Sequence, residues 1–229
     1  MNIMLVSATE TEIAPLFTFL ENSAKKLSSN YFIYNRLHIQ IIITGPGIMN
    51  TTFALCTSLQ GQNTDLIINV GIAGAFNTQI PKGAVFTIDK DRFADFGTEN
   101  ADASFTDIFS MGLQDKNEAP YSDGWIGLTE ELPEHLHLLK GKGVTVNKVT
   151  GTIRSAEELI NLYQPDIESM EGAAFAFVAA KLHIKSLQIR AISNHVEARN
   201  RANWDLPLAI SNLNTKLLQI IDYLAEKRV

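Results

Sequence analysis

The chain has 229 residues, of which 45% are hydrophobic and 19% are charged, and its formal net charge is −6. This composition is typical of a well-packed globular protein and argues against a disordered chain. The negative charge argues against a nucleic-acid-binding or membrane-binding surface, although a few local arginines could still hold a small anion. Because Cys56 is the only cysteine, an intrachain disulfide and a cysteine-rich metal site are also excluded.

The first predicted element is a strand at residues 3–7, where the chain carries a short apolar run. The N-terminus lacks the basic segment of a signal peptide, and the polar residues T-E-T-E follow the strand closely. No stretch reaches the roughly 20 apolar residues that a membrane-spanning helix needs. We therefore expect a cytoplasmic protein that does not bind a membrane.

Strand-like and helix-like patterns alternate along the rest of the chain. Strands are indicated by continuous apolar runs, and helices by apolar residues at helical spacing. The predicted strands are 31–34, 37–44, 65–70, 84–89, 144–149 and 186–193, and the predicted helices are 13–20, 48–59, 155–162, 173–182 and 206–224. The first two of these strands are expected to form a hairpin. Cys56 falls within helix 48–59, where we expect its thiol to be buried and unreactive.

Continuous apolar strands that alternate with helices indicate a largely parallel sheet that is covered on both faces. We therefore predict an α/β fold of three layers, α/β/α, whose central sheet is largely parallel but mixed because of the hairpin. The sequence has no repeat or linker, so residues 1–229 are expected to form a single domain. The polar, turn-rich segment 100–124 could be a lid, an oligomer contact or a plain loop.

Polar residues gather near the C-terminal strand, in the segment 168–204. Glu171 opens an otherwise apolar helix, and Asn194 ends the strand that follows it; Arg199, Arg201 and Trp204 come next. Ligands of α/β sheets bind at the carboxyl ends of strands, so this segment is the main candidate site. Each residue also has a structural explanation: Glu171 could complement a helix dipole, Asn194 could cap a turn, and the arginines could be solvated.

Three further segments allow two interpretations. Glu12 lies three residues after Thr9, so it could complete a capping box, or it could act as a general base at the end of the first strand. The glycines of G-P-G at 45–47 and G-I-A-G at 71–74 could form turns or let the backbone approach a ligand. Neither segment matches a dinucleotide or P-loop pattern. The pattern S-A-E-E at 155–158 predicts a capping box.

These segments resemble the nucleoside phosphorylase/nucleosidase superfamily. The matching segments are S-A-T-E-T-E-I, T-G-P-G-I-M-N, N-V-G-I-A-G-A-F, A-D-F-G-T-E, V-T-G-T, S-M-E-G-A-A and R-A-I-S-N. Within the superfamily, A-D-F-G-T-E and the pattern S-N-x-V-x-x-R-x-R-x-x-W resemble the futalosine hydrolases. The resemblance implies hydrolysis of the N-glycosidic bond of futalosine in menaquinone biosynthesis, which releases hypoxanthine and dehypoxanthine futalosine. It also implies a homodimer or larger homo-oligomer. No metal or other cofactor is expected, because the five histidines show no metal-ligand spacing such as H-x-x-x-H.

The resemblance also implies roles for particular residues. Glu12 falls on the acid/base that activates water, Glu171 on the carboxylate that binds the ribosyl hydroxyls, and Met170 on the residue that packs under the sugar. Gly74 and Thr152 lie in matching segments and are assigned to substrate binding.

Asn194 falls where adenine-cleaving relatives carry Asp. A neutral amide offers an NH₂ donor to a 6-oxopurine, so Asn194 favours a hypoxanthine-type base. Arg199 or Arg201, with Trp204 against the ring, is our hypothesis for binding the benzoate group of futalosine.

Other readings stay open. A methylthioadenosine/S-adenosylhomocysteine-type nucleosidase is possible, although Asn194 argues against it. A purine nucleoside phosphorylase would need a cationic phosphate site, whereas the first strand ends in the acidic A-T-E-T-E. A nucleoside-binding sensor on the same fold would need no catalysis.

Overall fold

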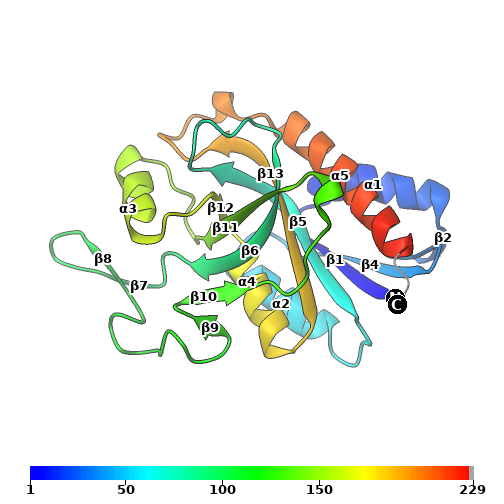
Figure 1. Cartoon of the computed structure of the whole chain (residues 1–229), viewed down its shortest axis with the longest axis horizontal. Coiled ribbons are helices and arrows are strands. Elements are labelled where there is room, and N and C mark those ends of the chain that lie inside the picture. The colour runs from blue at the N-terminus through cyan, green and yellow to red at the C-terminus, as the bar shows by residue number, and fades with distance from the viewer. Residues whose placement is uncertain (227–229) are drawn as a thin grey trace.

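The computed structural model describes residues 1–226. A large sheet forms the centre of the molecule, and a small hairpin stands apart from it at the left of Figure 1. The strands are β1 (Asn2–Ser7), β2 (Lys25–Ser28), β3 (Tyr31–Tyr34), β4 (Leu37–Ile43), β5 (Leu66–Ala75), β6 (Val85–Phe93), β7 (Gly97–Glu99), β8 (Phe105–Asp107), β9 (Tyr121–Ser122), β10 (Trp125–Gly127), β11 (Leu139–Thr145), β12 (Ile167–Ser169) and β13 (Lys185–His195). The α-helices are α1 (Glu10–Ser23), α2 (Ile48–Ser58), α3 (Ile153–Tyr163), α4 (Gly172–Lys181) and α5 (Leu206–Glu226), and short 3-10 turns lie at Glu134–Leu136 and Arg201–Asn203.

The large sheet is mixed and partly closed. Its strand order is β2-β3-β4-β1-β5-β12-β11-β6-β10-β9, and β13 pairs with both β5 and β6. Strands β5, β12, β11, β6 and β13 therefore form a closed circuit of pairing. Parallel pairs join β1 to β4 and β5, and β13 to β5, whereas the predicted hairpin of β3 and β4 is antiparallel. The predicted mixed sheet is confirmed.

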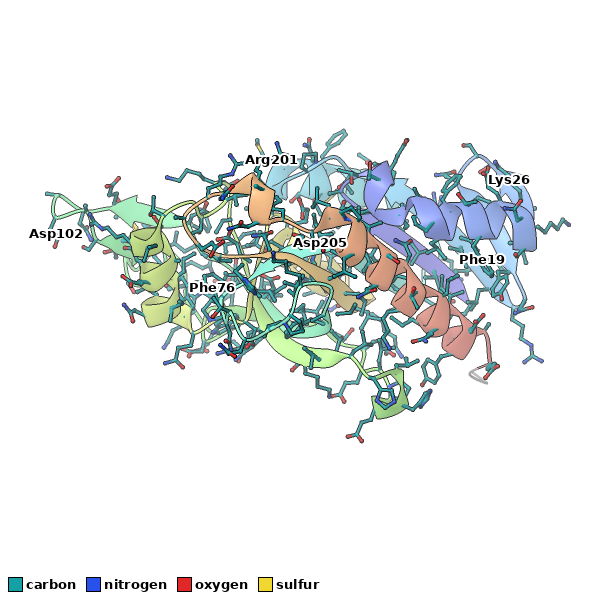
Figure 2. The ribbon with its side chains drawn as sticks, turned by 90° about the horizontal axis from the view of Figure 1, so that it is seen from above. Phe19, Lys26, Phe76, Asp102, Arg201 and Asp205 are labelled. Atoms are coloured by element: carbon teal, nitrogen blue, oxygen red, sulfur yellow. The ribbon has the colours of Figure 1, made fainter. Side chains whose placement is uncertain are left out.

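Helices cover both faces of the sheet. Alternate residues of β1 point to opposite sides, so Ile3 and Leu5 pack in one apolar cluster while Met4 and Val6 pack in another. Helices α1 and α5 pack their apolar side chains into the first cluster, and the two helices lie side by side in Figures 1 and 2. Helices α2 and α4 supply the second cluster, and α4 is buried along most of its length as predicted. This arrangement confirms the three-layer α/β/α architecture.

Several predicted strands differ from the structure by a few residues, and the largest differences are in β5 and β11. β5 continues to Ala75, so the G-I-A-G segment is part of a strand and the turn interpretation is wrong. β11 runs from Leu139 to Thr145, so only the first two residues of the predicted strand 144–149 belong to it. The chain leaves the sheet after Val146 because the backbone and side-chain N–H groups of Asn147 bond the carboxylate of Asp95 instead of a strand.

Two local predictions are also wrong. Helix α3 begins at Ile153 with Thr152 as its N-cap, because the Thr152 hydroxyl accepts the backbone N–H of Ser155; Ser155 is not the cap. Cys56 is exposed. Helix α2 buries Thr51 and Leu55, which are four positions apart and share one face, whereas the next residue, Cys56, is rotated off that face. An apolar pattern does not tell which face of such a helix packs on the sheet.

The segment 100–124 contains β8, β9 and turns. With β7, strand β8 forms the hairpin that projects from the body of the molecule, and Asp102 lies at its end in Figure 2. Within residues 1–226, no helix is long and apolar enough to cross a membrane.

Candidate active site

A cavity of about 390 Å³ lies where β5, β12 and β13 end and where α1 and α4 begin. Its size is in the range that ligand sites in proteins occupy. The residues that line it include Glu12, Gly74, Glu168, Met170, Glu171, Asn194 and Trp204. All of these except Glu168 were predicted site residues, so the structure brings together six of them from segments far apart in the sequence.

Glu12 lies in the first turn of α1 and is only 8% exposed. Its Oε2 accepts hydrogen bonds from the backbone N–H of Thr9 at 3.0 Å and from the Thr9 hydroxyl at 2.8 Å. Its Oε1 accepts the backbone N–H of Ile72 at 3.1 Å. The predicted capping box is therefore present, and it holds the same carboxylate at the wall of the cavity. The two interpretations of Glu12 are compatible.

Glu171 is the N-cap of α4 and is 7% exposed. Its Oε1 accepts the backbone N–H of Gly47 at 2.9 Å, and its Oε2 lies 4.0 Å from the guanidinium of Arg190. The G-P-G segment therefore donates an N–H to the protein's own carboxylate. Gly47 has a φ of +92°, a conformation that favours glycine.

Arg190 is a buried cation behind the wall of the cavity, and its contact with Glu171 was not predicted from the sequence. It is 1% exposed, and its Nη2 donates a hydrogen bond to Oδ1 of Asn69. A Cβ added at Gly71 would overlap both the Arg190 guanidinium and Oε1 of Glu12. Gly71 therefore gives Arg190 room beside both Glu12 and Glu171. A charged residue in the otherwise apolar run I-R-A-I was the signal that could have indicated its burial.

Asn194 lies just after an irregularity in the pairing of β13 with β5, where Ser193 has no partner in the register. Such a bulge re-aims the side chains near it. The side chain of Asn194 donates to the carbonyl of His195 at 2.9 Å and accepts from the Ser193 hydroxyl at 2.8 Å. An amide has a second N–H and a second lone pair, so Asn194 can still bond a ligand.

A buried polar network supports the start of α4. Oδ1 of Asp91 accepts the Thr145 hydroxyl at 2.9 Å, and the Thr145 oxygen accepts the backbone N–H of Ala173 at 2.7 Å. Oδ2 of Asp91 accepts Nε2 of Gln188 at 3.0 Å. Burial raises the pKa of Asp91 to about 6, although the hydrogen bonds from Gln188 and Thr145 oppose this rise. The network holds the helix that presents Glu171.

Three predicted substrate-binding residues do not line this cavity. Thr152 is exposed and its hydroxyl is used to cap α3. Arg199 and Arg201 are exposed as well, and the guanidinium carbon of each lies 6.0 Å from the ring centre of Trp204. Because Trp204 lines the cavity, the two arginines lie beside its wall but not inside it.

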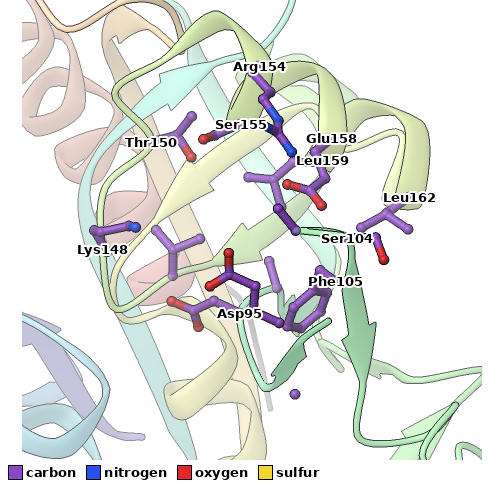
Figure 3. Close-up of a pocket in the computed structure, with 15 residues that line it drawn as sticks. Asp95, Ser104, Phe105, Lys148, Thr150, Arg154, Ser155, Glu158, Leu159 and Leu162 are labelled. Carbon is purple, nitrogen blue, oxygen red and sulfur yellow. The ribbon is translucent and has the colours of Figure 1, made fainter. Parts of the chain in front are cut away.

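A second cavity, of about 490 Å³, lies between α3 and the β7–β8 hairpin. Figure 3 shows Asp95, Phe105, Arg154 and Glu158 around it. The side chain of Arg154 lines this second cavity, so it does not lie with Glu12 and Glu171.

The sequence matches the phosphorylase superfamily over residues 2–224, and the chain belongs to this family. A futalosine hydrolase from Streptomyces coelicolor is 31% identical over 68% of this chain and 65% of the relative, so the match spans slightly less than two thirds of that protein. A futalosine hydrolase from Thermus thermophilus is 28% identical over 92% of this chain and 91% of the relative. The predicted resemblance to futalosine hydrolases is confirmed.

Solved structures show the same fold. A futalosine hydrolase from Helicobacter pylori has a TM-score of 0.77 and 16% identity, with 97% of both chains covered. A 5'-methylthioadenosine/S-adenosylhomocysteine nucleosidase from the same organism has a TM-score of 0.79 and 16% identity, with 97% of this chain and 98% of the other covered. At such identities the likeness establishes the nucleoside phosphorylase-like fold alone.

Proposed function

We propose that this protein is a purine nucleosidase that hydrolyses the N-glycosidic bond of futalosine and releases hypoxanthine. The observation that carries the proposal is the meeting of Glu12, Glu171 and Asn194 in one cavity. The futalosine hydrolases among its relatives support the choice of substrate.

Glu12 is the general base for water in this proposal. Its carboxylate is held by N–H groups from Thr9 and Ile72, and no cation within residues 1–226 forms a hydrogen bond with it. Glu171 binds the ribosyl hydroxyls and stabilises positive charge that develops on the sugar. Its second oxygen is only loosely paired, at 4.0 Å from Arg190, and is therefore available to accept a hydroxyl. Met170 lines the same cavity and packs under the sugar.

Asn194 activates the leaving base. A purine leaves more readily when N7 is hydrogen-bonded, and the second N–H of the Asn194 amide can supply that bond or one to O6. Gly74 pairs with Asn194 in the register, and a Cβ at Gly74 would lie 3.1 Å from its Nδ2. The glycine therefore leaves room for the base beside the amide.

The cavity favours water over phosphate as the nucleophile. Among the residues that line it in the described part of the chain, there are three glutamates and no lysine, arginine or histidine. Arg190 lies behind the wall and already pairs with Asn69 and Glu171. An anionic nucleophile would meet carboxylates, whereas phosphate sites use cations or N–H groups. This observation favours a hydrolase over a phosphorylase.

Arg199 and Arg201 are proposed to bind the carboxylate of the substrate tail, with Trp204 against its ring. The guanidinium carbon of each lies 6.0 Å from the ring centre of Trp204, which lines the cavity, and this position supports the role. We also propose a homodimer or larger homo-oligomer, because Met49 and Phe53 on α2 are 82% and 73% exposed, and exposed apolar patches often mark protein interfaces.

The test is incubation of the pure protein with futalosine, inosine or methylthioadenosine in the absence of phosphate, with base release followed by chromatography. Release of hypoxanthine from futalosine, and little release from the other two nucleosides, is the expected result. Turnover of methylthioadenosine alone would favour the second nucleosidase type. No release from any nucleoside, with or without phosphate, would refute catalysis and favour a sensor.

A further inference from the structure

Helix α4 begins without a cap from its own N-cap side chain. Glu171 is the N-cap residue, but its side chain forms no cap hydrogen bond. Its carboxylate instead accepts the backbone N–H of Gly47 and lies beside Arg190 at the wall of the cavity. An N-cap side chain usually accepts the backbone N–H of the second or third helical residue. At the start of α4, another part of the chain therefore has to bind these N–H groups.

Two hydroxyl groups from outside α4 bind its first N–H groups. The N–H of Gly172, the first helical residue, donates to Oγ of Ser169 at 3.3 Å. The N–H of Ala173, the second helical residue, donates to the hydroxyl oxygen of Thr145 at 2.7 Å. Thr145 is fully buried and is the last residue of β11, 28 positions before Ala173 in the sequence. A neighbouring strand thus supplies the cap that Glu171 does not supply.

The buried carboxylate of Asp91 fixes the direction of the Thr145 hydroxyl. A hydroxyl has one proton, and Thr145 donates it to Oδ1 of Asp91 at 2.9 Å. Asp91 is itself held by Nε2 of Gln188 at 3.0 Å. It lies directly against the start of α4, because a Cβ added at Gly172 would overlap its Oδ2. The lone pairs of the Thr145 oxygen are therefore left for the N–H of Ala173.

We propose that Thr145 is a positioning residue: its hydroxyl caps α4 in place of Glu171 and so leaves the Glu171 carboxylate free to bind the ribosyl hydroxyls. The proposal rests on the function proposed above, in which Glu171 contacts the sugar. Without the Thr145 hydroxyl, the N–H of Ala173 would be free at the positive end of the helix. It would attract the adjacent carboxylate, because anions are stabilised at helix N-termini. Glu171 would then turn away from Gly47 toward its own helix.

The variant Thr145→Val tests this role, because valine has nearly the shape of threonine but no hydroxyl. Its kcat/KM for futalosine should fall about 10- to 100-fold, the effect of losing hydrogen bonds to a charged group. Thr145→Ser restores the hydroxyl and should recover most of the wild-type value. The matched control is Thr51→Val, a buried threonine of α2 whose hydroxyl has no hydrogen-bond partner within residues 1–226. This control should keep the wild-type kcat/KM.

A second background separates positioning of Glu171 from a general structural role. Glu171→Ala removes the carboxylate, so Thr145→Val has nothing left to misplace and should change kcat/KM by no more than about twofold. Damage to the fold alone would lower kcat/KM by the same factor in both backgrounds. Equal factors in the two backgrounds, or wild-type activity of Thr145→Val, would overturn the proposal. Urea unfolding checks that each variant is folded in the assay.

Failure of wild-type protein to cleave futalosine would overturn the proposed function and this proposal with it, whereas the comparison of the two backgrounds can fail alone. If Thr145→Val does not fold, Thr145→Cys takes its place, because a thiol is only a weak donor and acceptor. The kcat/KM of Thr145→Cys should then lie well below that of Thr145→Ser. Equal values for these two variants would overturn the proposal.

Discussion

At the scale of single residues, the sequence identified carboxylates but not the groups that hold them. Glu12 could be predicted because it follows a strand and lies in a recognisable segment. Its contact with the N–H of Ile72 could not, because 60 positions of sequence separate the two residues. Arg190 was missed for the same reason: its partners, Asn69 and Glu171, lie in other elements.

Glu12→Gln should lower kcat for futalosine by about 10²- to 10³-fold, because an amide cannot take a proton from water. The change should also reduce stability by about 1 kcal/mol, since the amide NH₂ would face the N–H of either Thr9 or Ile72. Steady-state kinetics and urea unfolding measure the two effects. Glu10→Gln, an exposed residue of the same helical turn, is the control and should change neither. Retention of full kcat in Glu12→Gln would rule out its role as the base.

Asn194→Asp should move the preference from 6-oxopurine to 6-aminopurine nucleosides. A carboxylate offers no N–H to O6 or N7, so kcat/KM for futalosine should fall about 10- to 100-fold, with a smaller loss for the 6-amino analogue. The measurement is the ratio of the two kcat/KM values. If both substrates lost activity equally, Asn194 would have no part in base selection.

At the scale of elements, sequence periodicity predicted most helices and strands but not how the sheet closes. β12 has only three residues, I-E-S, which is too short for a periodic pattern, yet it links β5 to β11 and carries Glu168. The bulge that precedes Asn194 also depends on pairing between distant strands. Local patterns could therefore place Glu171 and Asn194 at the ends of elements, but not in one cavity.

The buried Asp91 under α4 leads to a prediction about pH. Its folded carboxyl, with a pKa raised from 3.8 to about 6, holds a proton more tightly than the unfolded chain does. The wild-type protein therefore loses this contribution to stability as the pH rises from about 4 to about 6. An Asn side chain does not titrate in this range, so the stability of Asp91→Asn does not carry this pH dependence. The free energy of unfolding of Asp91→Asn minus that of wild type should therefore rise by up to roughly 3 kcal/mol between about pH 4 and about pH 6.

Urea unfolding of Asp91→Asn and wild type at pH 4.5 and pH 7.5 checks this prediction. The Oε1 of Gln188 has no hydrogen-bond partner within the described residues. The Gln188 amide can therefore turn over in the variant, so that its Oε1 accepts a hydrogen bond from the side-chain NH₂ of the introduced Asn. Glu157→Gln, on the exposed surface of α3, serves as the control for general effects of lost charge. If the difference in free energy of unfolding between Asp91→Asn and wild type is the same at both pH values, the raised pKa of Asp91 is contradicted.

At the scale of the whole molecule, the order of strands and helices in the sequence was enough to predict the α/β/α layers. The cavity was not predictable in the same way, because its wall is assembled from α1, α4 and the ends of three strands. The acidic character of that wall determines the chemistry that we propose: three glutamates line the cavity, and Arg190, which lies behind the wall, already pairs with Asn69 and Glu171.

The most direct test of this account compares futalosine cleavage by phosphate-free protein with cleavage in millimolar phosphate, with both products identified. The account predicts the same rate of hypoxanthine release in both conditions, and dehypoxanthine futalosine with a free anomeric hydroxyl as the second product. Cleavage that requires phosphate and yields a sugar phosphate would contradict the central claim that Glu12 directs water to the sugar.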